Sequence, residues 1–320
     1  LLPKALLKGT TVVTKLISID EENFKDDVEV IGWLYQYYIQ SKKDEVFRKI
    51  KSNIKVNKDT LPAATQIFTP DWIVQYMTDN SLGKIWIESY PNSILKDKMN
   101  YFIQDNKRTD NENQRAESIR IRNVTPEDIK LIDPCCGSGH MLVYAFDIFY
   151  EMYLEKGVLK RDIPRLILEN NLYGLEIDKR ASQIASFALM MKARKYDSRF
   201  FEEQRLFLPN VNEIVESNII PVDLIKQLKD LKTLSNDDLS VISYVCDVFR
   251  NSKLYGSLIK LEEKEYKNSI NSLMSTLHKI QHIPNLFLQD LIFTYIPLLI
   301  KLLEQARMLT MKYDVVITNP

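Results

Sequence analysis

The chain has 320 residues, 45% hydrophobic and 27% charged, which is enough for one large domain or two ordinary ones. Its 43 basic and 43 acidic residues balance, so a uniformly basic nucleic-acid-binding body is excluded, although a local basic groove is not. Three cysteines and three dispersed histidines exclude a disulfide framework and a Cys/His zinc site, and they favour a cytoplasmic protein without a metal centre.

The first 60 residues are predicted to form a small helical region. Apolar side chains at Val30, Ile31, Leu34 and Tyr38 recur at intervals of three and four, which is the spacing of one face of a helix. We therefore expect residues 1–60 to be distinct from a domain that begins at residue 61.

The segment Phe68-Thr69-Pro70 is predicted to begin the next helix. Thr69 suits the N-cap and Pro70 suits the first helical position. The helix would continue through Asn80, and a second helix is expected near residues 85–94. An ordinary helix cap with a packed phenylalanine also explains this segment when it is taken alone.

Residues 128–133 are predicted to form a buried strand that ends in a tight turn and leads into an apolar helix. Gly137 and Gly139 lack a Cβ atom, so the backbone can approach a ligand closely, and the helix start offers free N–H groups. Asp133, at the strand end, can bind a cationic amino group. This combination predicts a nucleotide-type site at the carboxyl edge of a parallel sheet. The alternative is a plain strand-to-helix turn. The turn reads Pro134-Cys135-Cys136-Gly137-Ser138-Gly139.

Residues 172–178 form the second predicted strand, followed by a helix over residues 179–194. The order of strands and helices is that of a right-handed βαβ unit with parallel strands. The carboxylate of Glu176, beside Ile177, can hold both hydroxyls of a ribose. A charged residue at a strand end is the alternative explanation, but the preceding glycine turn favours a ribose site.

Residues from about 218 to 310 are predicted to form a mostly helical insertion without recognisable chemistry. Its most apolar stretch, residues 286–303, carries Gln289, Asp290 and Lys301. We therefore expect a buried helix there rather than a membrane span.

The chain ends with a short apolar strand that runs into Asn319 and Pro320. By itself, Asn-Pro after a strand is an ordinary turn signal. An asparagine oxygen and a neighbouring backbone carbonyl can, however, accept both protons of an adenine amino group. Accepting these protons helps to localise the lone pair of the nitrogen for attack on a sulfonium methyl group.

Taken together, the four motifs resemble the gamma-class amino-methyltransferases, in which they occur in this order. Within that class the chain resembles the PglX family, the methylases of BREX-type phage-defence systems. The resemblance covers the chain from about residue 60 to its end. The resemblance to the PglX family rests on three segments: Thr65 to Val74, Asp133 to Met141 and Tyr255 to Ile259.

The resemblance implies an α/β fold with an incomplete Rossmann-like methyltransferase sheet, an N-terminal helical region and a helical insertion. It implies S-adenosylmethionine (SAM) as the methyl donor, duplex DNA as the substrate, and other phage-defence proteins as partners. The implied reaction is site-specific methylation of adenine at N6.

The resemblance also implies roles for individual residues. The methionine end of the cofactor would be bound by Asp133, Pro134, Cys135, Gly137, Ser138 and Gly139, and the ribose by Glu176 and Ile177. Phe68, Thr69 and Pro70 would close over the cofactor, with Glu216 beside its adenine ring. Asn319 and Pro320 would hold the target amino group.

The chain departs from the family where it ends, because the proline and aromatic residue that follow Asn319-Pro320 in the family are missing. The later strands and the target-recognition domain are missing too, so we expect the chain alone to bind SAM weakly or not at all and to methylate nothing. The alternatives are a single-chain restriction-modification enzyme, an enzyme that modifies RNA or glutamine, and an inactive SAM-binding or assembly remnant. Enzymes that modify RNA or glutamine are generally compact, so the long insertion and the large N-terminal region favour DNA.

Overall fold

The computed structural model describes residues 30–57, 60–66, 69–104, 123–202, 206–261, 266–282 and 291–320, with isolated positions between 109 and 118. Phe68, part of the first motif, lies outside the described residues.

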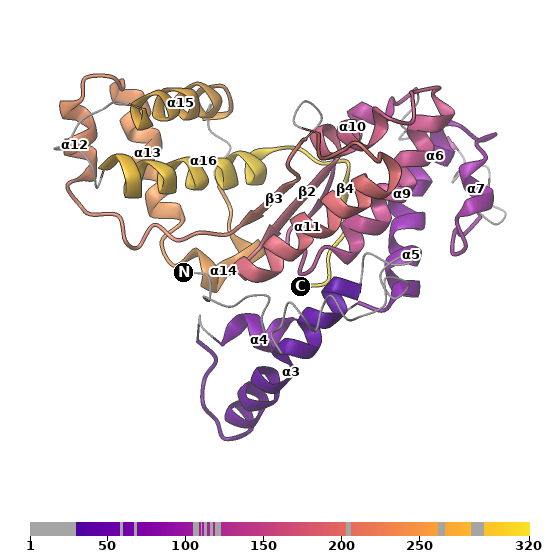
Figure 1. Cartoon of the computed structure of the whole chain (residues 1–320), viewed down its shortest axis with the longest axis horizontal. Coiled ribbons are helices and arrows are strands. Elements are labelled where there is room, and N and C mark those ends of the chain that lie inside the picture. The colour runs from indigo at the N-terminus through magenta and orange to yellow at the C-terminus, as the bar shows by residue number, and fades with distance from the viewer. Residues whose placement is uncertain are drawn as a thin grey trace, which may run out of the picture.

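A four-stranded parallel sheet lies at the centre of the fold (Figure 1). The chain builds the sheet outward from β1 to β3 and then returns to the other side of β1 with β4. In open α/β sheets, ligands bind outside the carboxyl ends of the strands at such a reversal. The predicted Rossmann-like α/β class is therefore confirmed. The strands are β1 (Leu131–Asp133), β2 (Leu172–Glu176), β3 (Asn210–Glu213) and β4 (Val315–Val316), in the order β3-β2-β1-β4.

The two inner strands are buried along their whole length, as expected for parallel strands covered on both faces. Alternate residues point to opposite faces, because the side chains of a strand have a period of two. Leu131 belongs to one hydrophobic cluster and Ile132 to the other, and Leu172 and Tyr173 are divided in the same way. The sheet therefore separates two cores.

Both inner strands are shorter than predicted, for local reasons. Residues Pro126–Asp128 form a 3-10 turn (η2), in which the Asp128 carboxylate accepts hydrogen bonds from the backbone N–H and the hydroxyl of Thr125, at 3.3 and 2.8 Å. The second strand ends at Glu176 because Asp178 caps the next helix, accepting a hydrogen bond from the backbone N–H of Arg180 at 2.8 Å.

Three helices cover one face of the sheet, and the two that were predicted to follow the first and second strands are confirmed. α9 begins directly after the glycine turn, α10 precedes β2, and α11 follows it, so that β1 and β2 each lead into a helix that packs back on the sheet (Figure 1). These helices are α9 (His140–Glu155), α10 (Ile163–Asn170) and α11 (Lys179–Tyr196).

The other face is covered by helices from the long connection between β3 and β4. Residues 286–290 of its apolar stretch lie outside the described part, and the stretch continues as helix from Leu291. None of the described helices combines the length and apolar character needed to cross a membrane. The elements are α12 (Leu224–Asp230), α13 (Asn236–Val248), α14 (Ser252–Tyr255), η3 (Gly256–Leu258), α15 (Tyr266–Gln281), η5 (Leu291–Tyr295) and α16 (Ile296–Thr310).

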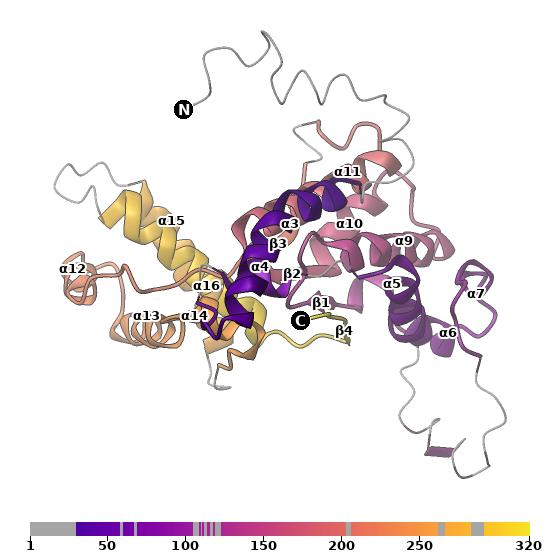
Figure 2. The same ribbon diagram turned by 90° about the horizontal axis from the view of Figure 1, so that it is seen from below.

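Helices α3 and α4 lie across the carboxyl ends of the strands, whereas α5, α6 and α7 lie to the side next to α9, as Figure 2 shows from below. The predicted helix near residue 30 is confirmed, but its predicted apolar face is not: Tyr38 is 68% exposed, whereas Ile39 is buried. The two helices predicted after Pro70 form one continuous run, because a π-helical turn joins them. The elements are α3 (Val30–Lys51), α4 (Leu61–Thr65), α5 (Asp71–Thr78), η1 (Asp79–Gly83), α6 (Lys84–Ser89) and α7 (Leu95–Lys98).

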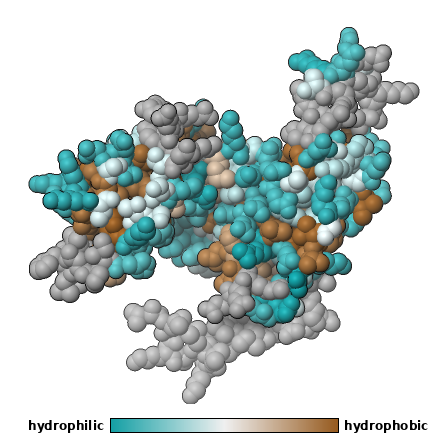
Figure 3. Space-filling model, turned by 90° about the horizontal axis from the view of Figure 1, so that it is seen from above, coloured by the Kyte–Doolittle hydropathy of each residue, from teal (hydrophilic) through white to brown (hydrophobic). Residues whose placement is uncertain are grey.

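Figure 3 shows the face seen from above, where hydrophilic residues in teal lie among apolar areas in brown.

Gly139, the N-cap of α9, is required by close packing as well as by its backbone conformation. Its φ is 85°, and a Cβ atom there would lie 2.9 Å from Cβ of Ala185 on α11. Gly157 has a similar φ of 77°, but a Cβ atom there would meet nothing within 4 Å. We therefore expect Gly157→Ala to lower the free energy of unfolding by about 1–2 kcal/mol, and Gly139→Ala to cost about 1–3 kcal/mol more through overpacking. Urea unfolding of both variants tests this, and equal losses would contradict it.

Candidate functional site

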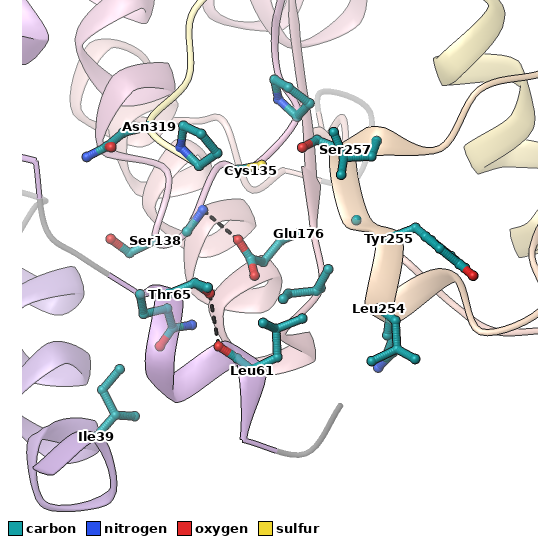
Figure 4. A pocket seen from close by; sticks show the side chains of 18 of the residues that line it. Ile39, Leu61, Thr65, Cys135, Ser138, Glu176, Leu254, Tyr255, Ser257 and Asn319 are labelled. Carbon is teal, nitrogen blue, oxygen red and sulfur yellow. Dashed lines mark hydrogen bonds between the residues drawn. The ribbon is translucent and has the colours of Figure 1, made fainter. Parts of the chain in front are cut away.

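A cavity of about 320 Å³ opens at the carboxyl ends of the strands (Figure 4). Its volume lies within the range of small-molecule sites. Six separate parts of the chain line it: α3, α4 with Gln66, the turn after β1, the end of β2, the segment 253–258, and the last two residues. Among the predicted site residues, the lining includes Pro134, Cys135, Gly137, Ser138, Glu176, Ile177, Asn319 and Pro320.

The Glu176 carboxylate holds the glycine turn in place. One oxygen accepts a hydrogen bond from the backbone N–H of Gly137 at 2.8 Å, and the other accepts one from the backbone N–H of Asp178 at 2.9 Å. Glu176 is only 5% exposed, and this burial raises the pKa of its carboxyl group, while the two N–H donors act in the opposite direction. Gly137 has a φ of 53°, and the space where its Cβ atom would lie is open. Glu176 and Gly137 thus present a carboxylate and a bare backbone to the same cavity.

Asp133 lies beside this cavity rather than in its lining. It borders a smaller cavity of about 40 Å³, which shares Cys135, Gly137, Ser138 and Asn319 with the larger one. The two predicted acids therefore face adjoining spaces and not separate surfaces. Burial raises the pKa of Asp133 to about 7, while the Cys135 backbone N–H, 3.0 Å away, and the Thr318 hydroxyl act against this rise. A buried carboxyl of this kind would gain from a cationic partner.

Asn319 borders both cavities, and its side chain reaches back to the first motif. Its Nδ2 donates a hydrogen bond to the Thr69 hydroxyl at 3.0 Å. The predicted N-cap role of Thr69 is therefore wrong. Pro70 occupies the N-cap position instead of the first helical position, no side chain caps the helix, and the helix begins at Asp71. The Thr69 hydroxyl faces the site and not its own helix.

Three other predicted cofactor residues lie apart from these two cavities. Gly139 and Pro70 line neither of them, and Gly139 packs against Ala185. Glu216 lines a further cavity of about 920 Å³, whose lining shares Ile177 and other residues with the first. Glu216 therefore borders the same cavity as Ile177, the residue after Glu176, and lies away from the glycine turn.

Sequence reasoning missed the contribution of the N-terminal helices. Tyr35 on α3 lines the large cavity and donates a hydrogen bond from its hydroxyl to Asp178 at 2.6 Å, and Gln66 donates another at 3.3 Å. Burial and the Asp178 carboxylate raise the pKa of Tyr35. Asp178 therefore caps α11 and also holds two N-terminal segments over the site. No local pattern around Tyr35 could have signalled this contact, which spans 143 residues.

The helical insertion supplies another wall of the cavity through residues 253–258. Lys253 pairs with Glu213 at the end of β3, with 2.7 Å between Nζ and Oε1. The Ser252 hydroxyl donates to the backbone carbonyl of Val215 at 2.8 Å. In Figure 4, Leu254 and Tyr255 lie on the opposite side of Glu176 from Asn319 and Ser138. From the sequence, the segment Tyr255 to Ile259 indicated only a resemblance to a family. In the structure, most of this segment borders the cavity.

Comparison with known proteins places this geometry in a family. Over its full length the chain is 34% identical to the adenine-specific methyltransferase BrxX of Escherichia coli O9:H4 (strain HS), of which it covers 27%. Over 80% of its length it is 38% identical to the adenine-specific methyltransferase PglX of Lacticaseibacillus casei (strain Zhang), of which it covers 21%. It therefore spans about a quarter of the length of these curated relatives.

A third relative is the putative type II restriction enzyme and methyltransferase RM.MjaORFECS2P of Methanocaldococcus jannaschii. Over 66% of its length the chain is 28% identical to this relative, of which it covers 18%. The resemblance inferred from the four motifs is confirmed by these matches. Residues 104–310, which include β1 to β3 and the glycine turn, match the family model described as MmeI, DNA-methyltransferase domain. The chain belongs to the family of the MmeI DNA-methyltransferase domain.

Proposed function

We propose that this chain is the cofactor-binding part of a DNA adenine-N6 methyltransferase that uses SAM and acts on duplex DNA in a BREX-like phage-defence system in the cytoplasm. One observation carries the proposal. Asn319 borders the same cavity as Glu176 and Gly137, so a candidate base-binding group and a candidate cofactor pocket meet at one place. The names of two relatives, both adenine-specific methyltransferases, support the choice of substrate.

The residues at the site fit SAM. Glu176, a buried carboxylate beside the open Gly137 backbone, would accept the ribose hydroxyls. Burial raises the pKa of Asp133, and the amino group of a methionine moiety would supply its carboxylate with a cationic partner. When bound, SAM supplies an electrophilic methyl group on its sulfonium sulfur.

Asn319 would act on the target base. The lone pair of an adenine amino group is delocalised into the ring, which makes the nitrogen a poor nucleophile. A side-chain oxygen that accepts an amino proton favours a localised lone pair, and the Asn319 amide nitrogen is already engaged by Thr69, which leaves Oδ1 for this task. The base must leave the duplex to reach such a cavity.

The decisive experiment uses the protein expressed from its complete gene, incubated with methyl-labelled SAM and duplex DNA. We expect label on N6 of adenine within a fixed sequence, and weak or absent SAM binding and no methylation by the 320-residue chain alone. Label found on RNA or on protein would replace DNA as the substrate. Absence of both labelling and SAM binding by the complete protein would refute the proposal.

The Methanocaldococcus relative favours a second candidate, a single-chain restriction-modification enzyme. Incubating the complete protein with unmethylated and methylated duplexes would distinguish the two. Cleavage of the unmethylated DNA alone would establish the second candidate. Methylation without cleavage would support the first, in which other phage-defence proteins are partners.

A further inference from the structure

The contact between Thr69 and Asn319 joins residues that are 250 positions apart. Thr69 is 8% exposed and borders the small cavity together with Asp133 and Asn319. A threonine directly before Pro70 would ordinarily be explained as a helix cap, but no side chain caps α5. The hydroxyl is therefore available for Asn319.

The amide of an asparagine presents a donor on one side and an acceptor on the other. Only the acceptor side, Oδ1, can accept a hydrogen bond from a target amino group. A rotation by 180° about the last side-chain bond would turn Nδ2 toward that group and place two donors against each other. In the observed orientation the Thr69 hydroxyl accepts from Nδ2; since a hydroxyl can also donate, the contact holds the amide in place at the cavity and does not forbid the rotation.

We propose that Thr69 is a positioning residue, whose hydroxyl accepts from Asn319 Nδ2 and thereby holds the amide where Oδ1 can meet the amino group to be methylated. This inference rests on the proposed function. It assigns Thr69 a task other than the cofactor contact that the sequence resemblance implied. Thr69 holds the last motif in place, and β4 carries Asn319 to the same edge of the sheet as β1.

The test compares Thr69→Val and Thr69→Ser in the protein expressed from its complete gene. Valine has the shape of threonine without the hydroxyl, and serine retains the hydroxyl. We expect Thr69→Val to lower kcat roughly ten- to hundredfold, because small errors of positioning are costly in catalysis. SAM affinity should stay within about twofold, and Thr69→Ser should restore most of the rate. A wild-type rate in Thr69→Val, or a loss of SAM affinity parallel to the loss of rate, would overturn the proposal.

Thr78→Val is the matched control. Thr78 is buried on α5, borders none of the three cavities described above, and donates its hydroxyl proton to the carbonyl of Val74 at 2.8 Å. The Thr78→Val variant therefore removes a buried threonine hydroxyl from the helix that follows Thr69, without touching Asn319. We expect its kcat per folded molecule to equal that of the wild type. An equal loss of kcat in Thr78→Val and Thr69→Val would show that the effect comes from the stability of the helix.

A double-mutant cycle with Asn319→Ala shows whether Thr69 acts through Asn319. If it does, the double variant should be no slower than Asn319→Ala alone, because the group that Thr69 positions is already gone. Additive losses would overturn the proposal. A wild-type protein that methylates nothing would refute the proposed function itself. In that case urea unfolding of the same four proteins still measures whether the two residues are coupled, and additive changes there would refute the contact.

Discussion

Asp133→Asn is expected to weaken SAM binding by about a hundredfold, because it leaves the amino group of the ligand without a charged partner in a buried site. Asparagine has nearly the same shape, and its oxygen can still accept the hydrogen bond from the Cys135 backbone. The loss should therefore reflect charge and not a disturbed turn. Isothermal titration of the complete protein with SAM measures it.

The wild-type affinity for SAM should also depend on pH. The pKa of Asp133 is about 7, and only the ionised carboxylate attracts an amino cation. Roughly one molecule in ten carries this charge at about pH 6 and roughly nine in ten at about pH 8, so the affinity should rise about tenfold over this interval. Asp133→Asn should remove this rise. A persistent rise in the variant would assign the titration to another group, such as Glu176, whose charge already raises the pKa of Asp133.

Burial of Asp133 should also make the stability of the ligand-free protein fall with rising pH, whereas the affinity for SAM should rise. The pKa of Asp133 is higher in the folded state than in an unfolded chain, so the folded state binds more protons and loses stability as pH rises toward about 7. Removing this charge by Asp133→Asn should raise the free energy of unfolding at about pH 8 by at least about 1 kcal/mol, since one pKa unit corresponds to about 1.4 kcal/mol. A variant that is more stable and yet binds SAM poorly would fit a ligand site and not a structural one.

Asp79→Asn is the matched control for these measurements. Asp79 is another fully buried acid whose pKa is raised by burial, but it contacts Tyr144 and Tyr101 and borders none of the cavities described above. Its replacement can change stability, but the folded variant should bind SAM as the wild type does. If Asp79→Asn and Asp133→Asn weakened SAM binding equally, the assignment of Asp133 to the ligand would be wrong.

The part of the site around β1 and β2 could be predicted from the sequence because its signals are local. A buried strand that stops at Asp133, a turn with two glycines and an apolar helix lie within a short segment, and the second strand repeats the pattern up to Glu176. The hydrogen bond between Glu176 and Gly137 follows from the parallel pairing of these two strands. Local sequence patterns were therefore enough to predict which residues meet across these two neighbouring strands.

The rest of the site depends on packing between distant segments, which no local pattern encodes. Thr69 looked like a helix cap because the residues next to it suit one, and only the position of β4 shows that its hydroxyl meets Asn319. Tyr35 belonged to none of the predicted motifs, yet it donates to Asp178. Lys253 lay in a segment without recognisable chemistry, and its pairing with Glu213 places that segment at the cavity.

Asn319→Ala is expected to reduce methylation about a hundred- to thousandfold, the usual cost of removing one oriented polar group that acts on the reacting centre. SAM affinity should stay within about twofold, because the buried carboxylates of Asp133 and Glu176 remain in place. Rates of DNA methylation and titration with SAM, measured on the complete protein, separate these two effects. Loss of SAM binding in this variant would instead make Asn319 a cofactor ligand.

Asn236→Ala is a matched control, since Asn236 is exposed at the start of α13 and borders none of the three cavities described above. Asn319→Asp is more informative. Aspartate keeps an acceptor oxygen for the target amino group but cannot donate to Thr69 in its ionised form. Its rate should therefore lie between those of Asn319→Ala and the wild type. If the aspartate variant were as slow as the alanine variant, the amide nitrogen and its hold on Thr69 would matter as much as the acceptor oxygen; if it were as fast as the wild type, the oxygen alone would carry the chemistry.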